Sequence, residues 1–179
     1  MNGILNYINK LDITAQVTDE EIKQTQALLR IYRPAMKHSA NSLEEMDDEC
    51  HAARAQSITD FIVLSVNYDQ DTDRRRIAER LAGMGHSMQF LMLLEETLLR
   101  VRDEPKCGDF YYQMLKVRYF DTYCSSNEDA FLTLGIASST YYRNIKKAVK
   151  LFAAYLWHAV IPDLIISERR KSAPSSPLQ

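Results

Sequence analysis

Glycine and proline, the residues that most often interrupt helices, are scarce in this chain of 179 residues, which contains five of each. Over most of its length, apolar residues recur at spacings of three and four, the period of a helix with one buried face. The segment "TDEEIKQTQALLRIY" places Glu21 three residues after Thr18, as in a capping box, and Pro34 marks its expected end. We therefore predict an all-α fold, although the run 58–66 fits a helix or a short strand equally well.

A long apolar stripe runs through the middle of the chain, just after the polar connector 67–73. Gly83 and Gly85 interrupt it, so we expect two helices here, with Ser87 as the cap of the second. The stripe suits packing into the core, which we favour, and it would also suit pairing between helices of two subunits. Its members are Ile77, Leu81, Met84, Met88, Leu91, Leu98 and Val101.

Missing patterns narrow the class of protein. Cys50, Cys107 and Cys124 form an odd set without a C-x-x-C pair, which argues against a disulfide framework and a zinc site. The chain has no glycine-rich phosphate loop and neither a G-x-S-x-G nor an H-E-x-x-H pattern. It also lacks a secretory signal and any apolar run near the roughly 20 residues of a membrane span. We therefore expect a cytoplasmic protein that is not an enzyme, binds no metal or cofactor and contacts no membrane.

Charge divides the chain near "DEPKCGD", residues 103–109. Residues 1–106 carry 18 acidic and 13 basic side chains, a net of −5, whereas residues 107–179 carry 6 and 9, a net of +3. We expect an acidic helical region over 1–106, suited to oligomerisation or partner binding, and a second domain over 107–167. The tail 168–179, "ERRKSAPSSPLQ", lacks apolar periodicity and should be disordered. A polyanionic partner would have to meet a local basic patch in the second domain.

The pattern between residues 127 and 139 is typical of two helices joined by a tight turn. Asn127 can cap a short helix that has Glu128 and Asp129 in its first turn. Gly135 stands where this helix must stop, because glycine adopts positive φ without steric cost. Ser138 or Ser139 then begins a second helix. A short helix, a turn containing glycine and a second helix form the helix-turn-helix layout.

The second helix separates its residues into two faces. Tyr141, Ile145, Ala148 and Phe152 share the face expected to be buried. Residues 138–157 carry four cations and no acid. Short hydroxyl side chains would let the start of the helix approach base edges, Arg143 is long enough for a bidentate contact to guanine, and lysines suit phosphates. The alternative is a solvated basic face. The expected DNA-binding residues are Ser138, Ser139, Thr140, Tyr142, Arg143, Lys146, Lys147 and Lys150.

Three stretches resemble a known family: "LKVRYF", "LGIASSTYYRNIKKAVKLFAAYLW" and, near the start, "ALLRIYRPAMK". They are similar to the ArpU/RinA-type phage transcriptional regulators, whose C-terminal domain resembles sigma factor region 4. The resemblance implies a DNA-binding activator of late phage genes, such as packaging, morphogenesis or lysis genes. It places Ser138, Ser139, Tyr142 and Arg143 toward the bases. Ala137 departs from the family, which usually has a serine or threonine cap at this position.

We thus expect the protein to bind duplex DNA at a promoter in a bacterial host cell. One helix-turn-helix reads only a few base pairs, so useful specificity suggests a homodimer or cooperation with host RNA polymerase. Two alternatives remain at this point. One is a phage terminase small subunit that binds packaging sites as a ring. The other is an adaptor that uses the same fold to contact RNA polymerase or a sigma factor.

Overall fold

The computed structural model describes residues 13–42, 74–83, 88–124 and 126–172. These residues form helices and turns without a strand, which confirms the all-α prediction for this part of the chain. The run 58–66 lies outside the described residues. The helices are α2 (Asp19–Ser42), α4 (Arg74–Gly83), α5 (Met88–Arg102), α6 (Gly108–Leu115), the π-helix η1 (Lys116–Phe120), α7 (Asn127–Thr133), α8 (Ser138–Tyr155), the π-helix η2 (Leu156–Val160) and α9 (Ile161–Ser172).

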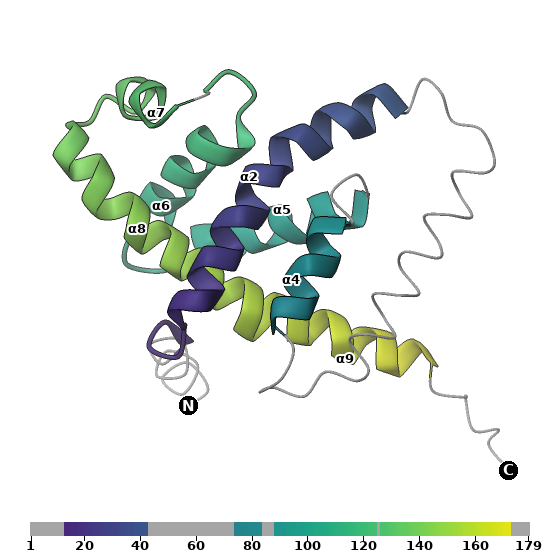
Figure 1. Cartoon of the computed structure of the whole chain (residues 1–179). Helices are drawn as coiled ribbons and strands as arrows, with labels where there is room; N and C mark the ends of the chain where they lie inside the picture. The colour runs from purple at the N-terminus through teal and green to yellow at the C-terminus, as the bar shows by residue number, and fades with distance from the viewer. Residues whose placement is uncertain (1–12, 43–73, 84–87, 125, 173–179) are drawn as a thin grey trace, which may run out of the picture.

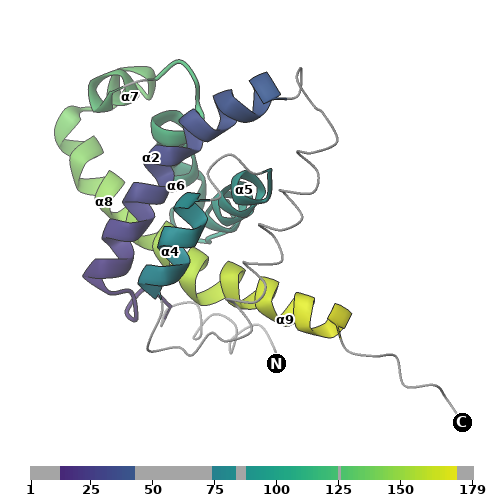
Figure 2. The same ribbon diagram turned by 45° about the vertical axis from the view of Figure 1, so that its right-hand side comes forward.

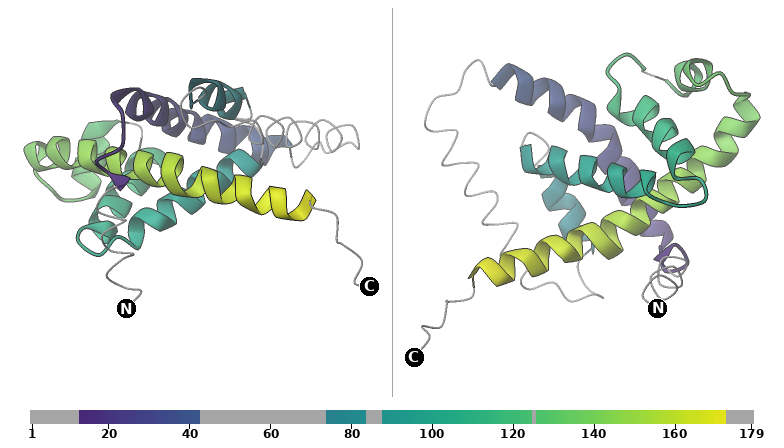
Figure 3. Two further views of the ribbon diagram at one scale, coloured as in Figure 1. Left: turned by 90° about the horizontal axis from the view of Figure 1, so that it is seen from below. Right: turned by 180° about the vertical axis from the view of Figure 1, so that it is seen from behind.

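A rod formed by α8, η2 and α9 runs through the whole molecule (Figure 1). Helices α2 and α4 lie on the near side in Figure 1, whereas the view from behind in Figure 3 shows α5 and α6 on the opposite side. The turned view in Figure 2 places α7 and the start of α8 at one end of the rod and α9 at the other. The first turns of α8 therefore project beyond the helices that cover the rest of the rod.

One hydrophobic core is continuous across the predicted domain boundary. It joins Leu28 of α2, Leu94 of α5 and Met114 of α6 to Phe152 and Trp157 of the rod, all of them buried. The segment 103–109 is a tight turn between α5 and α6, which pack on each other and on α8. The division at residue 106 is therefore a change in charge and a turn, and the described helices on its two sides share one interior.

The turn between α5 and α6 is closed by Gly108. A Cβ atom added there would lie 2.3 Å from the carbonyl oxygen of Arg102 and 2.7 Å from that of Val101, closer than real Cβ contacts. Glycine is needed because the backbones approach each other directly. The Tyr155 hydroxyl also donates to Glu104 Oε2 at 2.7 Å, so the rod holds the turn in place.

The start of α2 confirms the predicted capping box. The Thr18 amide donates to Glu21 Oε2 at 2.7 Å, and the Glu21 amide donates to Thr18 Oγ1 at 3.2 Å. Glu21 is only 1% exposed, and its Oε1 lies 2.8 Å from Arg74 Nε and 3.3 Å from His158 Nε2. The ion pair between Glu21 and Arg74 links α2 to α4, and the His158 ring of η2 packs beside Glu21 as the third member of this cluster. Burial lowers the pKa of His158, Glu21 opposes this shift, and Arg74 reinforces it.

The predicted end of this helix at Pro34 is wrong, because α2 continues through Pro34 to Ser42. A proline inside a helix removes one backbone hydrogen bond and costs about 3 kcal/mol. Packing compensates for this loss on both sides of the proline. Tyr32 and Ala35 are buried, and the Arg33 guanidinium donates to the carbonyl oxygens of Val117 at 3.1 Å and Arg118 at 2.6 Å.

The central apolar stripe folds as two helices, as predicted, because α4 ends at Gly83 and α5 begins at Met88. Core packing is confirmed for Ile77, Leu91, Leu98 and Val101, which are buried, whereas Met88 is exposed. The predicted cap Ser87, Met84 and the side chain of Leu81 lie outside the described residues.

The rod extends beyond the predicted start of the tail. Helix α9 runs to Ser172, so residues 168–172 are helical where disorder was expected, and residues 173–179 lie outside the described part. Pro162 is tolerated as the second residue of α9 because the π-helical turn η2, which ends two residues earlier, already interrupts the regular hydrogen-bond ladder. By length and composition, Ser138–Ser167 could cross a membrane, but 61% of its apolar window is buried inside the protein, as in a core helix.

Candidate nucleic-acid interface

Helix α7 is capped by Ser126, one residue before the predicted cap. The Asp129 amide donates to Ser126 Oγ at 3.0 Å, and the Ser126 amide donates to Asp129 Oδ2 at 2.9 Å. These two bonds form a reciprocal capping box that satisfies two donors at the helix start. The prediction that Asn127 caps this helix is therefore wrong, since serine and aspartate at the box spacing already fill that role.

Asn127 instead connects α7 to the two neighbouring elements. Its Oδ1 accepts a hydrogen bond of 2.6 Å from Arg118 Nε of η1 and one of 3.0 Å from the Tyr141 hydroxyl of α8. Burial raises the pKa of Tyr141, so its hydroxyl remains a donor over the whole physiological range. Arg33 of α2 binds the carbonyl oxygens of Val117 and Arg118. A chain of hydrogen bonds thus runs from α2 through η1 to the start of α7 and to α8.

Gly135 ends helix α7, as predicted. Its φ is +63°, and it is the one residue with positive φ among those the structure describes. The Gly135 amide donates to the Leu132 carbonyl at 3.1 Å, and the Ile136 amide donates to the Phe131 carbonyl at 3.1 Å. This pairing is a Schellman arrangement, which satisfies the last carbonyls of a helix and requires a left-handed residue. The chain can therefore reverse within four residues and begin α8 at once.

Helix α8 begins at Ser138 with Ala137 in the cap position. Ala137 has an extended backbone (φ −63°, ψ 142°) and provides no side-chain cap. The serine or threonine cap expected from the family resemblance is thus lost and is not replaced by Ser138. The exposed Ser138 and Ser139 lie in the first turn, where amide donors and the positive end of the helix dipole favour an anionic neighbour.

The two faces of α8 are as predicted. Tyr141, Ile145, Ala148 and Phe152 are buried against the core. Seven of the eight predicted DNA-binding residues are exposed on α8, and only Thr140 is half-buried. The seven exposed residues are Ser138, Ser139, Tyr142, Arg143, Lys146, Lys147 and Lys150.

Tyr142 lies at the edge of this exposed face. Its ring is 48% exposed and meets the ring of Tyr141 edge-on, with 5.4 Å between the ring centroids. Leu132 of α7 is 68% exposed and Tyr123, in the segment before α7, is 94% exposed. Both residues were missed in the sequence, because a single apolar residue in a short helix or loop carries no periodicity.

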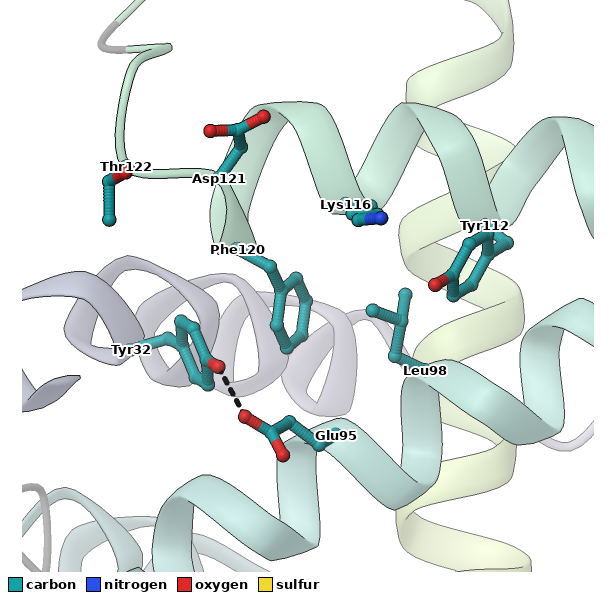
Figure 4. A pocket seen from close by; sticks show the side chains of 8 residues that line it. All are labelled: Tyr32, Glu95, Leu98, Tyr112, Lys116, Phe120, Asp121 and Thr122. Atoms are coloured by element: carbon teal, nitrogen blue, oxygen red, sulfur yellow. Dashed lines mark hydrogen bonds between the residues drawn. The ribbon is translucent and has the colours of Figure 1, made fainter.

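A cavity of about 400 Å³ lies between α2, α5 and η1 (Figure 4). Its walls carry three aromatic rings, and the Tyr32 hydroxyl donates to Glu95 Oε1 at 2.5 Å. The ring centroids of Tyr32 and Phe120 are 4.4 Å apart. These contacts join α2 to α5 and to η1. The cavity therefore lies beside η1, whose Arg118 binds the first residue of α7. The lining residues are Tyr32, Glu95, Leu98, Tyr112, Lys116, Phe120, Asp121 and Thr122.

The cavity and the rest of the described part contain no group of three or more His, Cys, Asp or Glu side chains that could hold a metal ion. In comparisons with known proteins, no family model, curated protein or solved structure matches this chain. The family resemblance of the three sequence stretches stands on those residues alone.

Proposed function

We propose that the protein binds duplex DNA as a transcriptional regulator, with α7 and α8 acting as a helix-turn-helix. The observation that carries the proposal is the exposed side of α8 from Ser138 to Lys150, which bears four cations and no acid. This side is presented at a projecting end of the molecule and is held rigidly by the buried side of the same helix. Rigid presentation of a helix start suits insertion into the major groove.

The exposed side chains divide into base-reading and backbone-binding roles. Arg143, one turn into the helix, reaches far enough for a bidentate contact to guanine, and Ser138 and Ser139 let the helix start come close to base edges. Tyr142 offers a hydroxyl and an aromatic edge beside Arg143. Lysines on the following turns bind phosphates. These contacts fix the position of the protein on the duplex and do not depend on the base sequence. Those lysines are Lys146, Lys147 and Lys150.

The resemblance to ArpU/RinA-type regulators supports a role at promoters of late phage genes. A single helix-turn-helix covers few base pairs, so a homodimer or a contact with host RNA polymerase would supply the remaining specificity. The polar-aromatic segment around Tyr123 offers exposed surface for such a contact next to α7.

The test is selection of bound duplexes from a random pool at about 150 mM salt, a physiological ionic strength. The wild-type chain should enrich a short motif. Arg143→Ala should relax one position of that motif and weaken binding by about 1–3 kcal/mol. The matched control is Arg170→Ala, which removes the same exposed charge from the far end of the rod and should leave the motif unchanged. Absence of any enrichment with the wild type would refute DNA binding and favour a protein-binding adaptor.

A further inference from the structure

Helix α2 carries a second basic surface that the proposed function does not use. The residues facing away from the core recur at spacings of four, three, four and three, so they form one straight stripe along the helix. The opposite side, with Leu28, Leu29 and Tyr32, is buried. We refer to the exposed set as the α2 stripe, which consists of Lys23, Ala27, Arg30, Pro34 and Lys37.

The α2 stripe is entirely cationic apart from small residues. Between Ile22 and Ser42 the helix contains no acid, and its three acids all fall in the first turn, Asp19–Glu21. Lys23, Arg30 and Lys37 are each seven residues apart, which is roughly 10.5 Å at 1.5 Å per residue. The short side chains of Ala27 and Pro34 between them leave the cations unobstructed.

The α2 stripe faces the same side of the molecule as the basic residues of α8. Lys146, Lys150, Ala153 and Trp157 follow one line along the rod, at spacings of four, three and four. Trp157 Nε1 donates to Thr25 Oγ1 of α2 at 2.9 Å. Helix α2 therefore covers this line of the rod beyond Lys150, the last of its cations.

Thr25 lies on the side of α2 opposite to the stripe, since it is two residues from both Lys23 and Ala27. The stripe therefore points away from α8, in the direction that the cations of α8 also face. Figure 1 shows α2 crossing in front of the rod, beyond the first turns of α8.

Arg30 also lies close to η1, the element that precedes α7. Burial raises the pKa of Tyr119 in η1, and the positive charges of Arg118 and Arg30 oppose that shift. The middle of the α2 stripe therefore lies near η1. Helix α2 packs on α8. Because the axes of packed helices usually lie about 8–10 Å apart, the α2 stripe is set above the cations of α8 by about that distance.

We propose that the α2 stripe is a second DNA contact, which binds the sugar–phosphate backbone beside the groove that α8 enters. This inference rests on the proposed function. The ligand is the backbone of the same duplex, because three evenly spaced cations without an acid between them complement a row of phosphates. Only Arg30 of the stripe could make a bidentate contact to a base. The stripe should therefore add affinity and salt dependence without changing sequence preference.

The experiment compares two variants of the full chain that lose the same three charges. In each variant, three exposed cations are replaced by glutamine. The first variant loses the cations of the α2 stripe. The control loses cations of α5 and the turn that follows it, which lie behind α2 in Figure 1. Dissociation constants for a selected and a random duplex are measured between about 50 and 200 mM salt. The variants are Lys23→Gln/Arg30→Gln/Lys37→Gln and Arg100→Gln/Arg102→Gln/Lys106→Gln.

The α2 variant should weaken binding to both duplexes equally and lower the slope of log K against log salt by up to about 2.7, at about 0.9 per phosphate contact. The control should change the slope much less, and both variants should keep the thermal transition of the wild type, because the replaced side chains are exposed. Equal slopes for the two variants would overturn the inference, as would a change in sequence preference. If Arg143→Ala still weakens binding in that case, the proposed function stands. Failure of the wild type to retain any duplex would refute both proposals.

Discussion

Gly135 limits substitution through its backbone conformation alone. Its φ of +63° closes the turn between α7 and α8, and a Cβ added there would meet no atom within 4 Å. The cost of replacement is therefore conformational and does not come from a clash. An L-residue in the left-handed region costs roughly 1–2 kcal/mol, and asparagine tolerates it best.

We predict that Gly135→Ala lowers the free energy of unfolding by about 1–2 kcal/mol. Gly135→Asn should cost clearly less, since the two side chains differ in their tolerance of positive φ. Urea unfolding of both variants measures the difference. Equal losses for alanine and asparagine would contradict the left-handed turn.

Single residues also show where sequence reasoning reached its limit. Ser126 and Asn127 are both good cap residues, and only the reciprocal bonds to Asp129 identify Ser126 as the cap. The role of Asn127 depends on Arg118 and Tyr141, which are distant in sequence. A partner that is chosen by tertiary packing leaves no local pattern.

At the scale of elements, helical periodicity predicted the faces correctly and the ends poorly. The buried side of α8 was predictable because Tyr141, Ile145, Ala148 and Phe152 follow the 3.6-residue period. The passage of α2 through Pro34 was not, since it depends on the contacts of Arg33 with η1. The extension of the rod through η2 likewise depends on core packing of Trp157 and Val160.

The shared core predicts that the C-terminal elements cannot fold alone. Helices α6 and α8 bury one side against α5 and α2, so a fragment of residues 107–179 would expose that surface. We expect the fragment to show no cooperative thermal transition by circular dichroism, whereas a fragment of residues 13–172 should retain the transition of the full chain. A cooperative transition of 107–179 near that of the full chain would show that the two regions are independent.

At the scale of the whole molecule, basic residues line the exposed sides of two helices, a pattern that the net charge of the chain does not reveal. The formal net charge is −2, which by itself indicates no polyanionic partner. The exposed sides of α8 and α2 are nonetheless free of acids over most of their length. The α8 part of this surface was predictable from a continuous stretch. The α2 part became visible only when the contact between Trp157 and Thr25 placed the two helices side by side.

The most direct test of the central claim maps the duplex onto the protein. The full chain, labelled with nitrogen-15, is titrated with a short duplex, and backbone amide signals are followed by nuclear magnetic resonance. We predict that the largest shifts fall between Ser138 and Lys150, with smaller shifts along the α2 stripe and none around Glu95 in the cavity. A saturating duplex that leaves the signals of Ser138–Lys150 unchanged would contradict the assignment of α8 as the DNA-reading helix.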